Sequence, residues 1–184
     1  MSQWRRRFIW ALVSVGVVAF QIRAVYAEKV IFAYPSPSTS FLPLVVAHKK
    51  GFFDVENLQV ELVQIRPAVC YSGFTTTMAK LKGNPQQIKK VLRAGLKGLR
   101  YVQDNRPGTI DVIQSWYRVE REVAGATYDL ARKSYSTNGE ISEKGVLLSM
   151  EFARSSGKFE KETLPSEIVD FNLLREVRKE LAGQ

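Results

Sequence analysis

The chain has 184 residues and a hydrophobic content of 45%, which suits one packed core and excludes a generally disordered chain. Lysine and arginine outnumber aspartate and glutamate by 27 to 18, a net charge of +9. Four arginines fall within residues 1–27, which hold no acid, so residues 28–184 carry 23 basic against 18 acidic residues, or +5. This modest excess argues only weakly for nucleic acid, and we expect no such partner.

Residues 1–27 have the pattern of an export signal. Three consecutive arginines precede a mostly apolar stretch over residues 8–20, and small residues near Ala27 suit cleavage after it. The apolar stretch is short for a transmembrane span. We therefore expect a periplasmic chain that begins at Glu28. The alternative is an uncleaved N-terminal anchor, which would be the chain's attachment to the membrane.

Residues 28–66 predict a βαβ unit. Residues 30–34 are rich in β-forming side chains, residues 41–47 form an apolar, helix-length run closed by Gly51, and residues 58–63 alternate as a strand does. Strands that pair in parallel need a crossover of this kind. A small parallel or mixed sheet is the expected result.

The polar loop after the first predicted strand holds the candidate binding residues, which are hydroxyl side chains and the start of the helix. They are Ser36, Ser38, Thr39, Ser40 and Phe41. Small ligands bind beyond the carboxyl ends of strands in open α/β sheets, and N–H groups at a helix start favour anions. An alternative of equal weight is that these residues only turn the loop, with Ser40 as the helix N-cap. Tyr34 and Tyr71 either flank such a site or belong to the core.

This stretch resembles a known family. The similarity lies in the first strand, the Ser/Pro loop, the helix with Pro43-Leu44, the turn over residues 47–53 and the strand over residues 58–63. Together they look like the opening of the nitrate/sulfonate/taurine-type solute-binding proteins of ABC importers, which are related to thiamine-pyrimidine-synthesis proteins. Asn57 stands where that family usually has glycine, and asparagine also enters left-handed turns.

Residues 70–184 predict a return strand followed by helices. Cys70 to Thr77 is β-rich, and Asn84 with Pro85 caps the clearest helix, which extends to about Asn105. Its apolar stripe consists of Ile88, Val91, Leu92, Leu96, Leu99 and Val102. Its basic residues are Lys89, Lys90, Arg93, Lys97 and Arg100. We expect them to form a solvated face, with membrane or partner binding as the alternative.

Four shorter helices follow, beginning after Pro107, near Glu120, at Ser142 and at Asp170. The residues expected to face the core are Ile110, Ile113 and Trp116; Val123, Ala126, Thr127 and Leu130; Val146, Leu147, Met150 and Ala153; and Leu173, Leu174, Val177 and Leu181. The segment over residues 168–174 also resembles the C-terminus of the solute-binding family.

The chain matches both ends of that family and lacks its middle, with the junction near residues 66–69. The resemblance implies one shortened lobe over residues 28–184, α/β in class and of the periplasmic-binding-protein type, with a mostly helical C-terminal half. It also implies non-catalytic capture of a small anionic or polar organic ligand, without cofactor or metal, for the membrane permease of an ABC importer. A shortened relative, a decayed gene and an assembly error would all give this pattern.

Two other functions remain open. One is a non-binding remnant or interaction protein, which pairs through a sheet edge left open by the missing middle or through the basic helix. The less favoured one is an enzyme of pyrimidine-precursor biosynthesis, because a related branch uses histidine and a Cys-rich iron-binding segment. The chain has only His48 and Cys70, and it has no hydrolase, P-loop or dinucleotide motif. We expect no catalytic residue.

Overall fold

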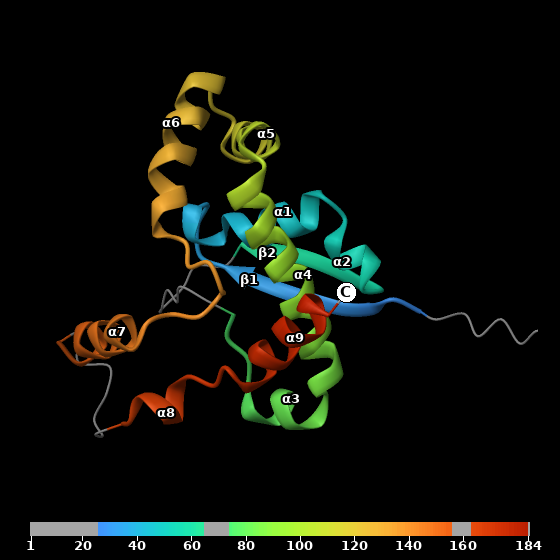
Figure 1. The fold of residues 1–184 in the computed structure, drawn as a ribbon, viewed down its shortest axis with the longest axis vertical. Helices are drawn as coiled ribbons and strands as arrows, with labels where there is room; N and C mark the ends of the chain where they lie inside the picture. The colour runs from blue at the N-terminus through green and yellow to red at the C-terminus, as the bar shows by residue number, and fades with distance from the viewer. Residues whose placement is uncertain (1–25, 65–73, 156–162, 184) are drawn as a thin grey trace, which may run out of the picture.

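The computed structural model describes residues 26–64, 74–155 and 163–183, which form an α/β fold that is mostly helical. Strands β1 (Glu28–Tyr34) and β2 (Leu58–Gln64) pair in parallel along their whole length (Figure 1). Helices α1 (Leu42–Lys49) and α2 (Phe52–Val55) connect them. The predicted βαβ unit is therefore confirmed.

Two residues in left-handed conformation make the turns around α2. Gly51 has φ +70° between α1 and α2, and Asn57 has φ +56° just before β2. Glycine and asparagine are the residues that enter this region at least cost. The asparagine at position 57 thus supports the same kind of turn that a glycine would, as the sequence predicted.

The remaining described elements are helical. They are the short turns η1 (Thr39–Phe41) and η2 (Arg132–Ser134) and the helices α3 (Met78–Gly83), α4 (Pro85–Asp104), α5 (Arg106–Tyr117), α6 (Arg121–Ala131), α7 (Glu143–Ser155), α8 (Pro165–Ile168) and α9 (Asn172–Ala182). Asn84 caps α4 as predicted, since its Oδ1 accepts the N–H of Gln87 at 3.1 Å. The capping box is not completed, because Gln87 Oε1 is buried without a hydrogen-bond partner.

The predicted return strand differs from the structure where it is described. Phe74 to Thr77 form no strand, and the Thr77 hydroxyl instead caps α3 by accepting the N–H of Lys80 at 3.1 Å. Residues 70–73 lie outside the described residues, as do residues 1–25 of the expected signal over residues 1–27 and the proposed junction over residues 66–69.

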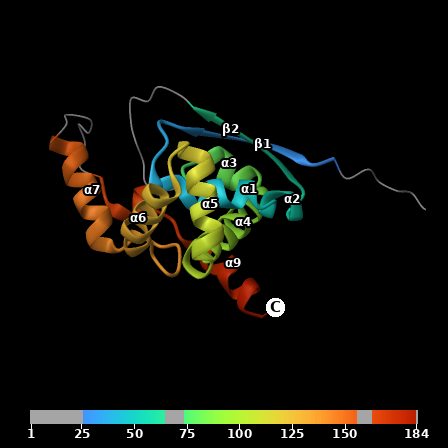
Figure 2. The same cartoon turned by 90° about the horizontal axis from the view of Figure 1, so that it is seen from above.

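Helices cover one face of the sheet. The side chains of Val30, Phe32, Val60 and Leu62 pack against a buried cluster contributed by α1, α2 and α4. Figure 2 shows the two strands along one side of the molecule with these helices on the other. On the opposite face Ile31 is 60% exposed. Among the described residues no further strand pairs with β1 or β2.

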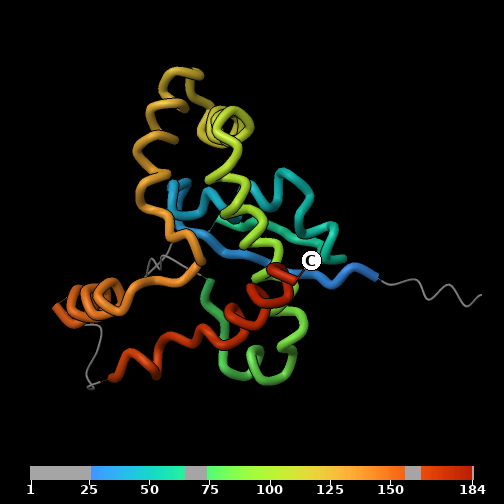
Figure 3. The backbone as a smooth tube through the Cα atoms, in the orientation of Figure 1, coloured from blue at the N-terminus to red at the C-terminus, as the bar shows by residue number. Residues whose placement is uncertain are grey.

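Helix α4 lies at the centre of the helical layer and crosses α1 very closely (Figure 3). The contact point is Gly98, where a Cβ atom would lie 2.2 Å from the carbonyl oxygen of Pro43 and 2.9 Å from the Cβ of Ala47. No side chain fits in that space. Glycine at position 98 therefore sets how closely α1, and the loop before it, approach α4.

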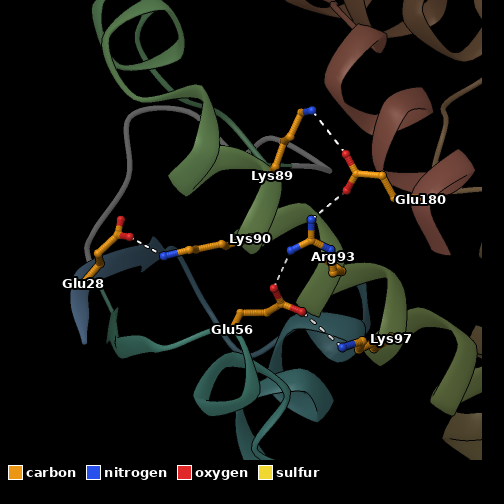
Figure 4. A network of polar contacts seen from close by, with 7 residues as sticks. All are labelled: Glu28, Glu56, Lys89, Lys90, Arg93, Lys97 and Glu180. Atoms are coloured by element: carbon orange, nitrogen blue, oxygen red, sulfur yellow. Dashed lines mark hydrogen bonds and ion pairs between the residues drawn. The ribbon is translucent and has the colours of Figure 1, made fainter. Parts of the chain in front are cut away.

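The basic face of α4 was predicted to be solvated, and this prediction is wrong for most of it. Glu56, whose side chain is only 9% exposed, accepts bonds from Arg93 at 2.5 Å and from Lys97 at 3.1 Å (Figure 4). A carboxylate this buried needs such partners. Arg100 is the residue of the predicted basic face that is exposed, whereas the other four are half-buried.

The same face of α4 also binds the two ends of the described fold. Arg93 reaches Glu180 of α9 at 2.7 Å, and Lys89 reaches the same carboxylate at 3.3 Å. Lys90 pairs with Glu28 at the start of β1. Lys90 lowers the pKa of Glu28, chiefly through its hydrogen bond. Hydrogen bonds from Arg93 and Lys89 likewise lower the pKa of Glu180. The charges that looked free in the sequence hold α9, α4 and β1 together.

The predicted core face of α6 is also wrong. Val123 and Leu130 are 51% and 78% exposed, whereas Ala124 and Tyr128 are buried against α5. Leu147 of α7, another expected core residue, is 49% exposed, and others such as Trp116 of α5 and Leu181 of α9 are half-buried. Helix α6 thus packs on α5 through Ala124 and Tyr128, and Val123 and Leu130 face outward.

Glu56→Gln should lower the free energy of unfolding by about 1–3 kcal/mol, because it removes the charge that two cations bind in a nearly buried position. Urea unfolding measures this. Glu61→Gln is the matched control, since Glu61 pairs with Lys29 at 3.2 Å but is 55% exposed. That variant should change the value by less than about 1 kcal/mol. Equal effects of the two variants would contradict the structural role given to Glu56.

Gly98→Ala should destabilise the fold by about 1–3 kcal/mol or more, because the added methyl group collides with the backbone of α1. Gly83→Ala, at the end of α3, is the control, since a Cβ there meets nothing within 4 Å. It should be neutral or slightly stabilising. Thermal unfolding of both variants tests this, and a Gly98→Ala midpoint equal to that of the wild type would rule out the close crossing.

Candidate functional site

The predicted loop lies at the carboxyl end of β1, beside the end of β2. Gln64, the last residue of β2, donates from Nε2 to the carbonyl oxygen of Pro35 at 3.4 Å. Ser36 and Ser40 are exposed, and Ser38 and Thr39 are half-buried. The structure therefore places all four hydroxyl candidates at the edge where the two parallel strands end.

The helix cap differs from the prediction. Ser38, not Ser40, is the N-cap, and its Oγ accepts the N–H of Ser40 at 3.3 Å at the start of η1. Helix α1 begins only at Leu42, after Phe41, which makes no side-chain cap. The Ser38 hydroxyl is thus partly occupied by the turn, whereas no hydrogen bond is found for the hydroxyls of Ser36 and Thr39 among the described residues.

Aromatic rings gather beside this loop. The ring of Tyr34 lies 6.2 Å from that of Phe41 and 5.5 Å from that of Trp116, measured between centroids. Both distances fall in the range in which tilted aromatic pairs attract each other. Trp116 comes from α5, which packs against α1. The position of α1 thus brings a residue from the C-terminal half of the chain to the end of β1.

Tyr135, which follows η2, ties the loop to the helical layer. Its hydroxyl donates to the carbonyl oxygen of Thr39. Burial raises the pKa of Tyr135 well above its usual range, and the nearby Tyr117 adds to the shift. Burial also raises the pKa of Tyr117. Both phenols therefore stay protonated at neutral pH, and each carries a hydroxyl proton that it can donate.

Two donors in this region have no acceptor. The indole Nε1 of Trp116 and the hydroxyl of Tyr117 are buried without a hydrogen-bond partner among the described residues. From the sequence, Trp116 was expected in the core, and Tyr117 and Tyr135 were not among the candidate site residues. The sequence did offer one signal. Trp116 and Tyr117 are adjacent at the end of an amphipathic helix, and since neighbouring residues on a helix do not share a face, the two rings cannot both lie on its core face.

A hollow of about 570 Å³ lies between the loop after η2, α7, α8 and the start of α9. Its main charged groups are already paired, since Glu140 accepts from Arg175 at 3.0 Å and from Arg178 at 2.9 Å. These arginines lower the pKa of Glu140. Because its Glu140 and Arg175 are already paired with each other, we take the loop after β1 as the candidate site.

The described residues suggest neither a metal site nor a membrane span. No group of three or more histidine, cysteine, aspartate or glutamate side chains lies close enough together there to hold a metal ion. His48 is exposed in the last turn of α1. No helix in the same ranges is long and apolar enough to cross a bilayer.

Tyr135→Phe should lower the free energy of unfolding by about 0.5–1.5 kcal/mol and loosen the loop, because the carbonyl of Thr39 loses its donor. Hydrogen exchange at the amides of residues 36–41 measures the loosening. Tyr128→Phe is the control, since its hydroxyl donates to the carbonyl oxygen of Val102 at 2.9 Å. That variant should cost similar stability without faster loop exchange. Equal exchange in both variants would mean that Tyr135 does not hold the loop.

The comparisons with known proteins assign no family. No family model, no curated protein and no solved structure matches this chain. The similarity to solute-binding proteins consequently stays an expectation from the sequence motifs, and the site is interpreted from its own contacts.

Proposed function

We propose that this chain is a solute-binding protein that captures a small anionic or polar organic ligand without catalysis. The observation that carries the proposal is that Trp116, whose ring packs against Tyr34 at the end of β1, has a buried Nε1 without a hydrogen-bond partner among the described residues, as does the hydroxyl of the adjacent Tyr117. Buried donors are nearly always satisfied in native proteins. A ligand with acceptor oxygens would supply what this region lacks.

The place of the site supports the same proposal. Ligands of open α/β proteins bind beyond the carboxyl ends of the strands, and here both strands end beside the loop. Export to the periplasm and delivery to the permease of an ABC importer rest on the sequence pattern of residues 1–27 and on the motifs in β1, α1 and β2. The permease is therefore the proposed protein partner.

One alternative to solute capture is supported by an observation in the structure. The outer edges of β1 and β2 pair with no strand among the described residues, and Ile31 projects from the open face. An interaction protein that pairs through this sheet edge fits that geometry. Membrane binding through the basic face of α4 is less favoured, because most of that face is paired internally. No contact among the described residues favours the biosynthetic enzyme.

Thermal unfolding of the full chain with nitrate, bicarbonate, small sulfonates, pyrimidines and aromatic acids tests the proposal. A compound that binds only the folded state must raise the midpoint in proportion to the logarithm of its concentration once the site is saturated. We expect one class to do so. Absence of a shift with every compound, at concentrations up to 10 mM or so, would reject solute capture and favour the interaction alternative.

Replacing both Ser38 and Thr39 by alanine should weaken binding of that compound by about tenfold, the effect of losing one or two hydrogen bonds to a charged group. Isothermal titration calorimetry measures the affinity. Thr77→Ala is the matched control, because it removes a cap of the same kind from α3. It should reduce stability slightly and leave the affinity unchanged. Unchanged affinity in the double variant would remove the loop from the site.

A further inference from the structure

The rings beside the loop form a partly exposed aromatic surface made from two distant parts of the chain. Tyr34 and Phe41 come from the β1 side and Trp116 from α5, with tilted ring planes at 55° and 46° to that of Tyr34. All three residues are half-buried, so each keeps part of its surface accessible. A flat apolar group that packs here would extend the same tilted arrangement.

The unpartnered donors lie in the same region. Trp116 carries one of them, on the ring that packs against Tyr34. Tyr117 carries the other, and Trp116, Tyr117 and Tyr135 all pack against the same buried cluster. Tyr135 in turn donates to Thr39 in the candidate loop. Aromatic surface, hydroxyl loop and free donors thus meet at one end of the sheet.

The type of donor limits the ligand. An indole N–H only donates, so its missing partner is an acceptor, and a cation would leave it unsatisfied. Carboxylate and sulfonate oxygens are strong acceptors and make shorter, stronger bonds with such donors than neutral oxygens do. The aromatic surface adds a preference for a planar ring over an aliphatic group of the same size.

We propose that the site takes an aromatic organic anion, a ring that bears a carboxylate or sulfonate. The ring packs against Tyr34 and Trp116, and the acid group accepts from Trp116 Nε1, from the Tyr117 hydroxyl and from the loop. This inference rests on the proposed function and narrows its ligand class. Because both donor atoms are covered, binding requires a rearrangement of side chains in this cluster.

The chain offers a direct optical test of that rearrangement. It has three tryptophans, Trp4, Trp10 and Trp116. In the full chain carrying Trp4→Phe and Trp10→Phe, all tryptophan emission comes from Trp116. Titration with benzoate and benzenesulfonate should change this emission saturably. Cyclohexanecarboxylate, methanesulfonate and benzamide, which lack either the ring or the charge, should bind at least tenfold more weakly by calorimetry on the unsubstituted chain.

Tyr117→Phe separates binding from stability, because its hydroxyl makes no hydrogen bond that folding would lose. We expect an unchanged or raised unfolding midpoint and a five- to tenfold weaker affinity for benzoate or benzenesulfonate. Tyr128→Phe, whose hydroxyl is bonded, should show the opposite pattern, with lower stability and the same affinity.

The outcomes distinguish this inference from the proposed function. Equal affinity for benzoate and cyclohexanecarboxylate, binding of nitrate or methanesulfonate alone, or unchanged affinity in Tyr117→Phe would overturn the aromatic anion and leave solute capture standing. No saturable binding by any of these compounds or by the wider panel would overturn both. The comparison between compounds needs no variant, so a variant that fails to fold does not block it.

Discussion

The contact between α4 and α1 at Gly98 is the constraint on which the described structure depends. Without a side chain at this point, the two helices approach until the backbone of one meets the other. That approach fixes α1 over the sheet and so fixes the loop that precedes α1. It also aligns α5, the helix after α4, so that Trp116 reaches Tyr34. Residues that are 82 positions apart in the sequence become neighbours because of one missing methyl group.

Ion pairs add to the packing that holds α4 against its neighbours. Helix α4 presents an apolar and glycine-containing face to α1 and a cationic face to Glu28, Glu56 and Glu180. These acids come from the start of β1, the end of α2 and the last helix. A helix with strong charge along one side normally keeps it in water, but here the surrounding elements supply the counter-charges. The net charge of the chain therefore says little about how much positive surface remains available.

The parts of the fold that depend on neighbouring residues could be predicted from the sequence. The βαβ unit, the turn at Asn57 and the cap at Asn84 each follow from a local pattern, and the structure has all three. Predictions that depended on which distant part of the chain packs against a helix were less successful. The core face of α6 depends on its contact with α5, and the paired state of the basic residues depends on acids up to 91 positions away. For the site, the loop was predictable, whereas Trp116, Tyr117 and Tyr135 join it only through long-range packing.

Helices α7 and α8 stand apart from the helices around the sheet (Figure 1), and α7 packs mainly on α8. Val146 and Met150 of α7 are buried, but Leu147 and Leu148 of the same helix are about half exposed. A unit with so little shared core should have a smaller free energy of opening than the sheet and α4, which share one buried cluster, while α4 also contributes Val102 to a second one. We therefore expect α7 and α8 to open locally while the end of the sheet, with its loop and rings, stays assembled.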